Sequence, residues 1–349
     1  MSAPRRRLLP EWHPQDGVLL TWPHSESDWR PALTAIEAVY LSLVKAITRF
    51  ETALVVCRNA THLAHVRRQL EPAAIPPQRL ILTVTPSNDT WTRDYGPITV
   101  LENGVPCLLD FVFNGWGGKF PADLDNDVTH KLHAAGMFGD VPLQHLDFVL
   151  EGGSIDSDGG GRILTTRACL LTPTRNAGLD AAAVEHQLRE SLGIDEVLWL
   201  EHGYLAGDDT DSHIDMLARF CTPRTVAYTS CTDPGDEHFA ELQAMEHQLQ
   251  AMFSAADPAV ELIPLPLPAP QFDADGGRRP ASYVNFLILN GAVLVPAYGD
   301  PADLTAQERL QKCFPGRTLV NIDCRALIAQ GGSLHCATMQ LPGGVLGGD

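Results

Sequence analysis

The sequence predicts an α/β fold in which about five units follow one another around a closed ring. Short apolar runs typical of strands alternate with amphipathic stretches typical of helices, in the order strand, strand, helix, strand. This order recurs at a spacing of roughly 60 residues, although the sequences of the units differ. Asn-Gly pairs at residues 103–104 and 290–291 separate apolar runs. Such pairs favour tight hairpins because both residues tolerate positive φ.

The first two units are recognised by changes of hydrophobic period. The first has no visible hairpin, whereas the second opens with the hairpin at residues 103–104. The elements expected in the first unit are a strand within residues 17–24, a helix at 32–47 and strands at 53–57 and 80–84. In the second unit they are strands at 97–101 and 105–111, a helix at 127–138 and a strand at 148–150.

The remaining three units repeat the same order. Their expected strands are 154–156, 162–166 and 197–200, then 216–220, 225–229 and 260–263, then 283–289, 292–296 and 318–322, with helices at 180–192, 238–253 and 304–313. A last apolar run at residues 337–340 would supply the strand that the first unit lacks and so close the ring. The alternative is an open doubly wound sheet, but the sequence has no Gly-x-Gly-x-x-Gly fingerprint or Walker motif to support it.

Composition and charge limit the class of protein. The chain has 349 residues, 44% of them hydrophobic, which permits two domains or one large repetitive domain. A formal net charge of -18 argues against nucleic acid or an anionic membrane as partner and favours a small cationic one. A homo-oligomer is compatible with these features.

The sequence also predicts a cytoplasmic protein. The basic N-terminus is not followed by the apolar segment of a secretory signal, and no run reaches membrane-spanning length. The eight cysteines are scattered singly. This pattern indicates reduced thiols and not a disulfide scaffold or a zinc site.

Reactive side chains stand where the predicted hairpins begin. A ring would bring these positions to one axis. They are Asp94 before the second hairpin, Glu151 before the third, His213 and Asp215 before the fourth, Asn285 in the fifth and Cys336 at the closing strand.

Taken singly, most of these residues have ordinary explanations. Asp94 follows Arg93, and the two are compatible with a surface ion pair. Glu151 precedes two glycines and is compatible with a loop cap. Trp91 and Trp116 are compatible with core packing.

The pair His213 and Asp215 has two further interpretations. Two residues apart on a strand, they would share one face, which suits a structural hydrogen bond between the imidazole and the carboxylate. They are also compatible with two ligands of a metal site that has Cys336 as its third.

Together the residues suit chemistry on a guanidinium group. Carboxylates bind this planar cation bidentately, so Asp94 and Asp215 on opposite sides would hold it flat. Cys336 would attack its carbon, and the bound cation lowers the cost of forming the thiolate. His213 would protonate departing ammonia and then deprotonate a water, while Glu151 orients it. The substrate carries its own positive charge, so this scheme needs no metal and no cofactor.

The sequence resembles the agmatine deiminase family, which includes the bacterial porphyromonas-type peptidylarginine deiminases. The resemblance runs in order over nearly the whole chain. The motifs that carry it are residues 22–24, 88–97, 113–119, 151–154, 213–215 and 335–336. The resemblance implies a single guanidino-modifying domain over residues 1–349. It also implies a five-bladed α/β propeller of repeated ββαβ units, the pentein fold.

Carried over to these positions, the resemblance implies that Cys336 is the nucleophile and His213 the acid–base. Asp94 and Asp215 become guanidinium ligands, and Glu151 assists.

Secondary positions complete the expected substrate site. The resemblance implies that Asn285 belongs to it and that Trp91 lies along the methylene chain. Trp116 is a candidate second wall, and Asp209 is our candidate for the distal ammonium. The sequence also departs from the family pattern, with Ser212 where many members have glycine.

The activity expected from the resemblance is hydrolysis of agmatine to N-carbamoylputrescine and ammonia through a thiouronium on Cys336. Free or peptidyl arginine is an alternative substrate, and an amidinotransferase is an alternative reaction. A guanidino-binding protein without turnover is an alternative of another class.

Overall fold

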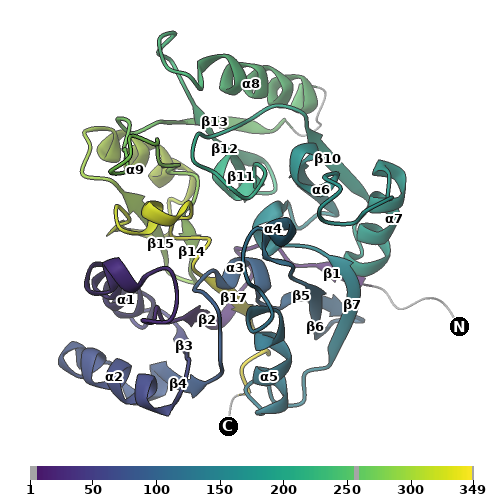
Figure 1. Ribbon diagram of the computed structural model, residues 1–349. Coiled ribbons are helices and arrows are strands. Elements are labelled where there is room, and N and C mark those ends of the chain that lie inside the picture. Colours follow the sequence, from purple (N-terminus) through teal and green to yellow (C-terminus); the bar gives the residue numbers. More distant parts are fainter. Residues whose placement is uncertain (1–5, 255–258, 348–349) are drawn as a thin grey trace, which may run out of the picture.

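The computed structural model describes residues 6–254 and 259–347. Within them, five small sheets stand around a central axis, and the longer helices cover the outside of the ring (Figure 1). This arrangement is the predicted five-bladed α/β propeller, and it excludes the open doubly wound sheet.

The first sheet joins the two ends of the chain. Strand β17 pairs antiparallel with β2, while β2, β3 and β4 pair in parallel. The C-terminal strand therefore closes the ring, as predicted. The strands are β2 (Gln15–Thr21), β3 (Thr52–Cys57), β4 (Leu80–Val84) and β17 (Met339–Pro342), and the helices are α1 (Leu33–Ile47) and α2 (Ala60–Leu70). Helix α2 was not predicted; the side chain of Asn59 caps it by accepting a hydrogen bond from the His62 N–H.

The second sheet contains the predicted Asn-Gly hairpin. Both turn residues have positive φ, 55° at Asn103 and 87° at Gly104, as the pair predicts. The sheet consists of β1 (Arg6–Leu8), β5 (Ile98–Glu102), β6 (Val105–Val112) and β7 (Leu143–Val149), with helix α5 (Val128–Ala134). Strand β1 is an addition to the predicted unit, and α5 is shorter than the expected helix at 127–138.

The other three sheets share one plan. In each, two strands form an antiparallel pair, and a third strand returns parallel after a crossover helix. They are β8 (Ile155–Ser157), β9 (Arg162–Thr166) and β10 (Glu196–Leu200) with α7 (Ala181–Leu192); β11 (Ala218–Thr222), β12 (Thr225–Ser230) and β13 (Glu261–Pro266) with α8 (Phe239–Phe253); and β14 (Leu287–Ile288), β15 (Ala292–Ala297) and β16 (Thr318–Asp323) with α9 (Ala302–Cys313).

The fifth unit differs from its prediction in one strand. The apolar run at 283–289 was expected to be a strand throughout, but only Leu287–Ile288 pairs, as β14. The preceding residues leave the sheet and approach the axis, where Asn285 bonds to residues of other units. Tertiary contacts here outweigh the strand propensity of the run.

No helix among the residues that the structure describes is both long and apolar enough to cross a membrane.

A fully buried arginine ties several blades together near the axis. Arg219 on β11 forms ion pairs with Glu11, in the segment before β2, and with Asp156 on β8, the latter at 3.1 Å. Its guanidinium also donates to the carbonyl oxygens of Val284 and Phe286. Because burying a charge is favourable only when it is well paired, these contacts fix the relative positions of three units and the N-terminal segment.

Replacing this arginine should therefore destabilise the whole ring. In Arg219→Met, the buried Asp156 loses its ion-pair partner and the partly buried Glu11 loses one of several, and we expect the free energy of unfolding to fall by about 3–5 kcal/mol. Urea denaturation followed by circular dichroism measures the change. Arg224→Met, at an exposed position on the same hairpin, is the matched control and should change little. Equal effects of the two substitutions would contradict this account.

Candidate active site

The reactive residues predicted from the sequence meet at the axis of the ring. They lie on short turns that precede the blade strands: α3 (Thr92–Tyr95) carries Asp94, η5 (Gly152–Ser154) follows Glu151, and η6 (Ile214–Met216) follows His213 and carries Asp215. Cys336 lies shortly before β17, and all five side chains are buried.

The expectation that His213 and Asp215 share a strand face is wrong. His213 directly precedes a 3-10 turn that contains Asp215, and neither residue lies on a strand. The preceding residues explain the difference, since Asp211 and Ser212 have positive φ, 66° and 65°, and so turn the chain before His213. The left-handed conformation at Ser212 is one that glycine adopts more easily than serine.

The sulfur of Cys336 lies between an acid and an amide. Sγ is 3.4 Å from Oδ2 of Asp215, and Nδ2 of Asn285 donates to it at 3.3 Å. The Asn285 amide also accepts the backbone N–H of His335 at 2.8 Å and donates to the carbonyl of Asp215 at 3.2 Å, which fixes both neighbours. Burial, and then the charges of Asp215 and Asp94, raise the pKa of the thiol well above its usual value. The resting group is therefore a thiol.

Asp94 is the less acidic of the two carboxylates. Its Oδ2 accepts the indole N–H of Trp116 at 2.9 Å, and its Oδ1 accepts the backbone N–H of Gly153 at 3.0 Å. Burial is the main cause that raises the pKa of Asp94 to about 6; the charge of His213 lowers it and that of Asp215 raises it. Gly153 must lack a side chain, because a Cβ there would lie 2.7 Å from both Asp94 Oδ1 and His213 Nδ1.

Asp215 has the opposite balance. Burial would raise its pKa, but the hydrogen bond and charge of His335, followed by the charges of His213 and Arg219, hold the pKa below its usual value. Oδ2 is occupied by His335 at 2.8 Å and by the thiol. Among the described residues Oδ1 has no hydrogen-bond partner, although it is buried. Asp215 is thus an ionised acid with one free oxygen.

His213 lies among acids without a close hydrogen bond. Nδ1 is 3.6 Å from Oδ1 of Asp94, and Nε2 is 3.9 Å from Oε2 of Glu151. Neither ring nitrogen has a hydrogen-bond partner within the part of the chain that the structure describes. Burial would lower its pKa, but Asp94, then Cys169 and Glu151, raise the pKa well above its usual value. The ring therefore carries a proton that it can donate.

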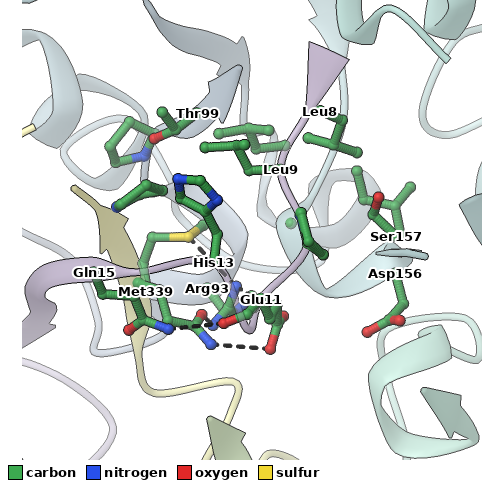
Figure 2. Close-up of a pocket in the computed structure, with 17 residues that line it drawn as sticks. Leu8, Leu9, Glu11, His13, Gln15, Arg93, Thr99, Asp156, Ser157 and Met339 are labelled. Atoms are coloured by element: carbon green, nitrogen blue, oxygen red, sulfur yellow. Dashed lines mark hydrogen bonds and ion pairs between the residues drawn. The ribbon is translucent and has the colours of Figure 1, made fainter. Parts of the chain in front are cut away.

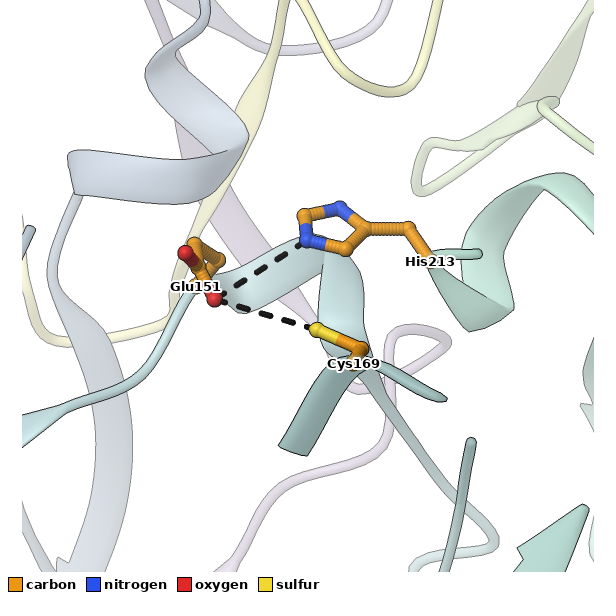
Figure 3. A group of neighbouring side chains, drawn as sticks. All are labelled: Glu151, Cys169 and His213. Carbon is orange, nitrogen blue, oxygen red and sulfur yellow. Dashed lines mark hydrogen bonds and ion pairs between the residues drawn. The ribbon is translucent and has the colours of Figure 1, made fainter. Parts of the chain in front are cut away.

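Glu151 is held by residues that the sequence did not indicate. Oε1 accepts from Nε of Arg175 at 2.8 Å, and both side chains are fully buried. Figure 3 shows Oε2 facing both the imidazole of His213 and the sulfur of Cys169, 4.0 Å from that sulfur. Arg175 also pairs with Asp211, so it links Glu151 to the loop before His213. A lone arginine in a turn and a lone cysteine on the short helix α6 (Arg167–Leu170) carry no local motif, which is why both were missed.

The structure brings together a different set of possible metal ligands from the one considered from the sequence. That set was His213, Asp215 and Cys336. Among residues 6–254 and 259–347, the only group of three such side chains with ligand atoms all within 4.8 Å of one another is Glu151, Cys169 and His213. These are donor types that zinc accepts. One oxygen of Glu151 is already bound by Arg175, and the geometry equally suits an acid that supports a charged histidine.

An open cavity with about 780 Å³ of empty space leads to the thiol. Its wall is aromatic and acidic, and none of the described residues that line it is lysine, arginine or histidine. The predicted substrate-site residues Trp91, Trp116 and Asp209 all line it. Also in its wall are Asp28, Asp89, Phe120 and the glycines of the sequence before Cys336. Such a wall attracts a cation and repels a carboxylate.

The two glycines before Cys336 are required for steric reasons. A Cβ at Gly332 would lie 2.3 Å from Cζ3 of Trp91, so only glycine lets the chain pass this ring. Gly331 has a φ of 80°, which other residues rarely adopt. The pair therefore brings Cys336 and Trp91 into the same cavity.

Comparison with known proteins identifies the family. Residues 7–342 match the family described as Porphyromonas-type peptidyl-arginine deiminase. The chain belongs to this family.

Full-length relatives of the family are similar to the chain. The agmatine deiminase of Stutzerimonas stutzeri is 34% identical, over 98% of this chain and 97% of that protein. A substrate-bound agmatine deiminase of C. jejuni has 36% identity and a TM-score of 0.91, over 98% of this chain and 97% of its own. A protein of Porphyromonas gingivalis, provisionally described as an arginine deiminase, has 48% identity and a TM-score of 0.91, over 98% and 99%.

Protonation of Asp94 should weaken binding of a guanidinium group in this cavity. Above pH 6 the carboxylate is ionised; as the pH falls through about 6 it takes up a proton and no longer attracts the cation. We expect the affinity for agmatine to fall over that range. Calorimetric titration of agmatine into the Cys336→Ala variant, in which turnover does not interfere, measures this change.

Two tryptophan substitutions test whether this pH dependence arises from Asp94. Trp116→Phe removes the N–H that Asp94 accepts and should move the midpoint to higher pH. Trp199→Phe removes an indole N–H from Glu185 on another face and should leave the midpoint unchanged. An affinity that does not vary near pH 6, or an unshifted midpoint in Trp116→Phe, would contradict the role of Asp94.

Proposed function

We propose that this protein is an agmatine deiminase, which hydrolyses agmatine to N-carbamoylputrescine and ammonia through a covalent intermediate on Cys336. The observation that carries the proposal is the acidic cavity, which leads to a thiol set beside a buried carboxylate. Agmatine carries a cation at each end, and this cavity offers negative charge at both its base and its wall. Membership of the family and full-length relatives named agmatine deiminase support the same conclusion.

Substrate binding follows from the charges. The guanidinium would lie between Asp94 and Asp215, with an N–H donated to the free Oδ1 of Asp215. The methylene chain would pass between Trp91 and Trp116, and Asp209 would face the distal ammonium. Lys119 donates to the backbone carbonyl of Asp209 and not to its carboxylate. The carboxylate therefore stays available to a ligand in the cavity, which Asp209 lines.

The first half of the reaction transfers the amidino carbon to sulfur. Burial raises the pKa of the Cys336 thiol most, and the charges of Asp215 and Asp94 raise it further. Binding of the cation offsets these two charges and so favours loss of the thiol proton. The Cys336 sulfur gives its proton to solvent water in the open cavity and forms a bond to the guanidinium carbon. The C–N bond then breaks, and His213 donates its proton to the departing ammonia. The product of this half is a thiouronium on Cys336.

The second half hydrolyses this thiouronium. His213, now neutral, removes a proton from a water as the water oxygen bonds to the carbon. The C–S bond breaks, and the hydroxyl proton of the product passes to the departing sulfur, which releases N-carbamoylputrescine and returns the Cys336 thiol. Glu151, aligned by Arg175, stabilises the charged form of His213 in both halves. One water is consumed and one ammonia is released for each turnover.

Arginine is the second candidate substrate. The provisional description of the 48% identical Porphyromonas gingivalis protein favours it. Arginine has an α-carboxylate, which needs a cationic partner in the cavity. The described lining residues include Asp28, Asp89 and Asp209 but no lysine, arginine or histidine. The structure therefore supports agmatine over arginine.

We also propose that residues 1–349 act as one deiminase domain in a reducing, cytoplasmic compartment. All eight cysteines are free and buried, as expected where disulfides do not form.

Steady-state rates on matched substrates test the proposed substrate. We expect kcat/KM for agmatine to exceed that for arginine and for 4-guanidinobutanoate by about 100-fold, because a carboxylate placed among acids costs several kcal/mol. It should also exceed that for a peptidyl arginine, which has no distal ammonium for the acidic wall. The compound 4-guanidinobutanoate replaces the distal ammonium by a carboxylate on a chain of similar length, so it isolates that charge. Faster turnover of arginine than of agmatine would overturn the choice. Release of ammonia without an added amine acceptor separates hydrolase from amidinotransferase.

Two substitutions test the chemistry. Cys336→Ala should abolish turnover, and His213→Ala should lower kcat by about 10²–10⁴-fold, while both variants still bind agmatine. Mass spectrometry of wild-type enzyme denatured during turnover should find an amidino adduct on Cys336. Near-normal rates in either variant, or an adduct on Cys169, would refute the mechanism; Cys169→Ala is the matched thiol control.

A further inference from the structure

The residue before the nucleophile is a histidine placed between two carboxylates. His335 is buried, with Nδ1 2.8 Å from Oδ2 of Asp215 and Nε2 2.7 Å from Oε1 of Glu11. Each of these short contacts needs a proton on the ring or on the acid. Burial, Arg219 and Arg93 lower the pKa of His335, whereas Glu11 and the hydrogen bond to Asp215 oppose this shift. The mechanism described above assigns no role to His335 or Glu11.

Glu11 is itself anchored from several blades. It forms an ion pair with Arg219 and lies 3.4 Å from Nη1 of Arg93. Nε2 of Gln340 donates to it at 2.9 Å. Figure 2 shows Glu11 beside Arg93 in a second cavity, which is lined by different residues from the one that leads to the thiol. Glu11 is thus a fixed support on the side of His335 away from Asp215.

The two carboxylate oxygens of Asp215 differ in their hydrogen-bond partners. Its Oδ2 is taken up by His335 and by the thiol of Cys336. Its Oδ1 is buried and finds no partner among the residues that the structure describes. An acid whose one oxygen is bound by a fixed donor cannot rotate freely, so the other oxygen keeps a constant direction.

We propose that His335 and Glu11 are positioning residues that hold Asp215 ionised and oriented, with Oδ1 free to accept an N–H of the guanidinium. This inference rests on the proposed function. Residues that hydrogen-bond to a metal-bound histidine fix its tautomer and its orientation. His335 and Glu11 fix the charge and the orientation of the Asp215 carboxylate in the same way.

The arrangement has a consequence for the pH dependence. The charged or titratable groups that face Asp215 are His335, His213, Arg219, Arg93, Cys336 and Asp94. Those that face His335 are Asp215, Glu11, Arg219 and Arg93. Without His335, burial and the neighbouring Asp94 would raise the pKa of Asp215. Two carboxylates would then take up protons in the same range of pH, and the acid limb of kcat/KM would become steeper and move to higher pH.

A pair of substitutions separates the two contacts of the ring. In His335→Asn the amide nitrogen can replace Nδ1 toward Asp215, whereas in His335→Gln it can replace only Nε2 toward Glu11. We expect kcat/KM for agmatine to fall about 10- to 100-fold in His335→Gln, with the altered acid limb, and less in His335→Asn. Glu11→Gln, which weakens the support without touching the nucleophile loop, should alter the acid limb in the same direction.

A surface histidine provides the matched control. His145 is mostly exposed and pairs through Nδ1 with Asp110 at 3.3 Å, so His145→Gln, whose amide cannot replace Nδ1, breaks a histidine–carboxylate pair elsewhere. It should leave the rate and acid limb unchanged. Thermal unfolding of every variant shows whether a loss of rate is a loss of fold.

Binding provides a second readout that is independent of turnover. In the Cys336→Ala background, His335→Gln should weaken agmatine binding and steepen its loss at low pH. A wild-type slope and midpoint in both His335→Gln and Glu11→Gln, at whatever reduced rate, would overturn the inference and leave the proposed function intact. Failure of the wild-type enzyme to turn over agmatine would instead overturn the proposed function.

Discussion

The structure depends on holding two acids, Asp94 and Asp215, in a buried site around one thiol. Like charges in a buried site are unfavourable, and the protein meets this cost unequally. Asp94 has its pKa raised to about 6, whereas Asp215 is kept acidic by neighbouring positive charge. Burial, together with the same negative charge, keeps Cys336 protonated. A bound guanidinium would offset the negative charge of Asp94 and Asp215 and so also favour the thiolate of Cys336. The free site is therefore complementary to a cationic substrate.

The ring makes this arrangement possible because every blade contributes a short turn at the axis. No single unit could surround a planar group, but turns from different units approach it from different directions. Buried arginines hold these turns in place: Arg219 joins the N-terminal segment to two blades, and Arg175 joins Glu151 to the loop before His213. Position and charge are thus fixed by the same side chains.

Acidic side chains form part of the wall of the cavity. A net charge of -18 could reflect solubility alone, yet the described residues that line the way to the thiol are aromatic, small, polar or acidic. Aromatic rings suit a methylene chain, and carboxylates suit its charged ends. The wall of the cavity therefore accounts for selection of a dication, whereas the base of the cavity accounts for the chemistry.

The sequence by itself determined the order of the units, the closing strand and the set of reactive side chains, because hydrophobic period, Asn-Gly turns and short motifs are local signals. Only the tertiary structure decided which of these side chains meet. It replaced the expected strand at His213 and Asp215 by a 3-10 turn and shortened the strand near Asn285. The contact between His335 and Glu11 joins residues 324 positions apart, and no local pattern records such a pair. Contacts of this kind arise from packing of the closed ring, so they could be found only once the blades were in place.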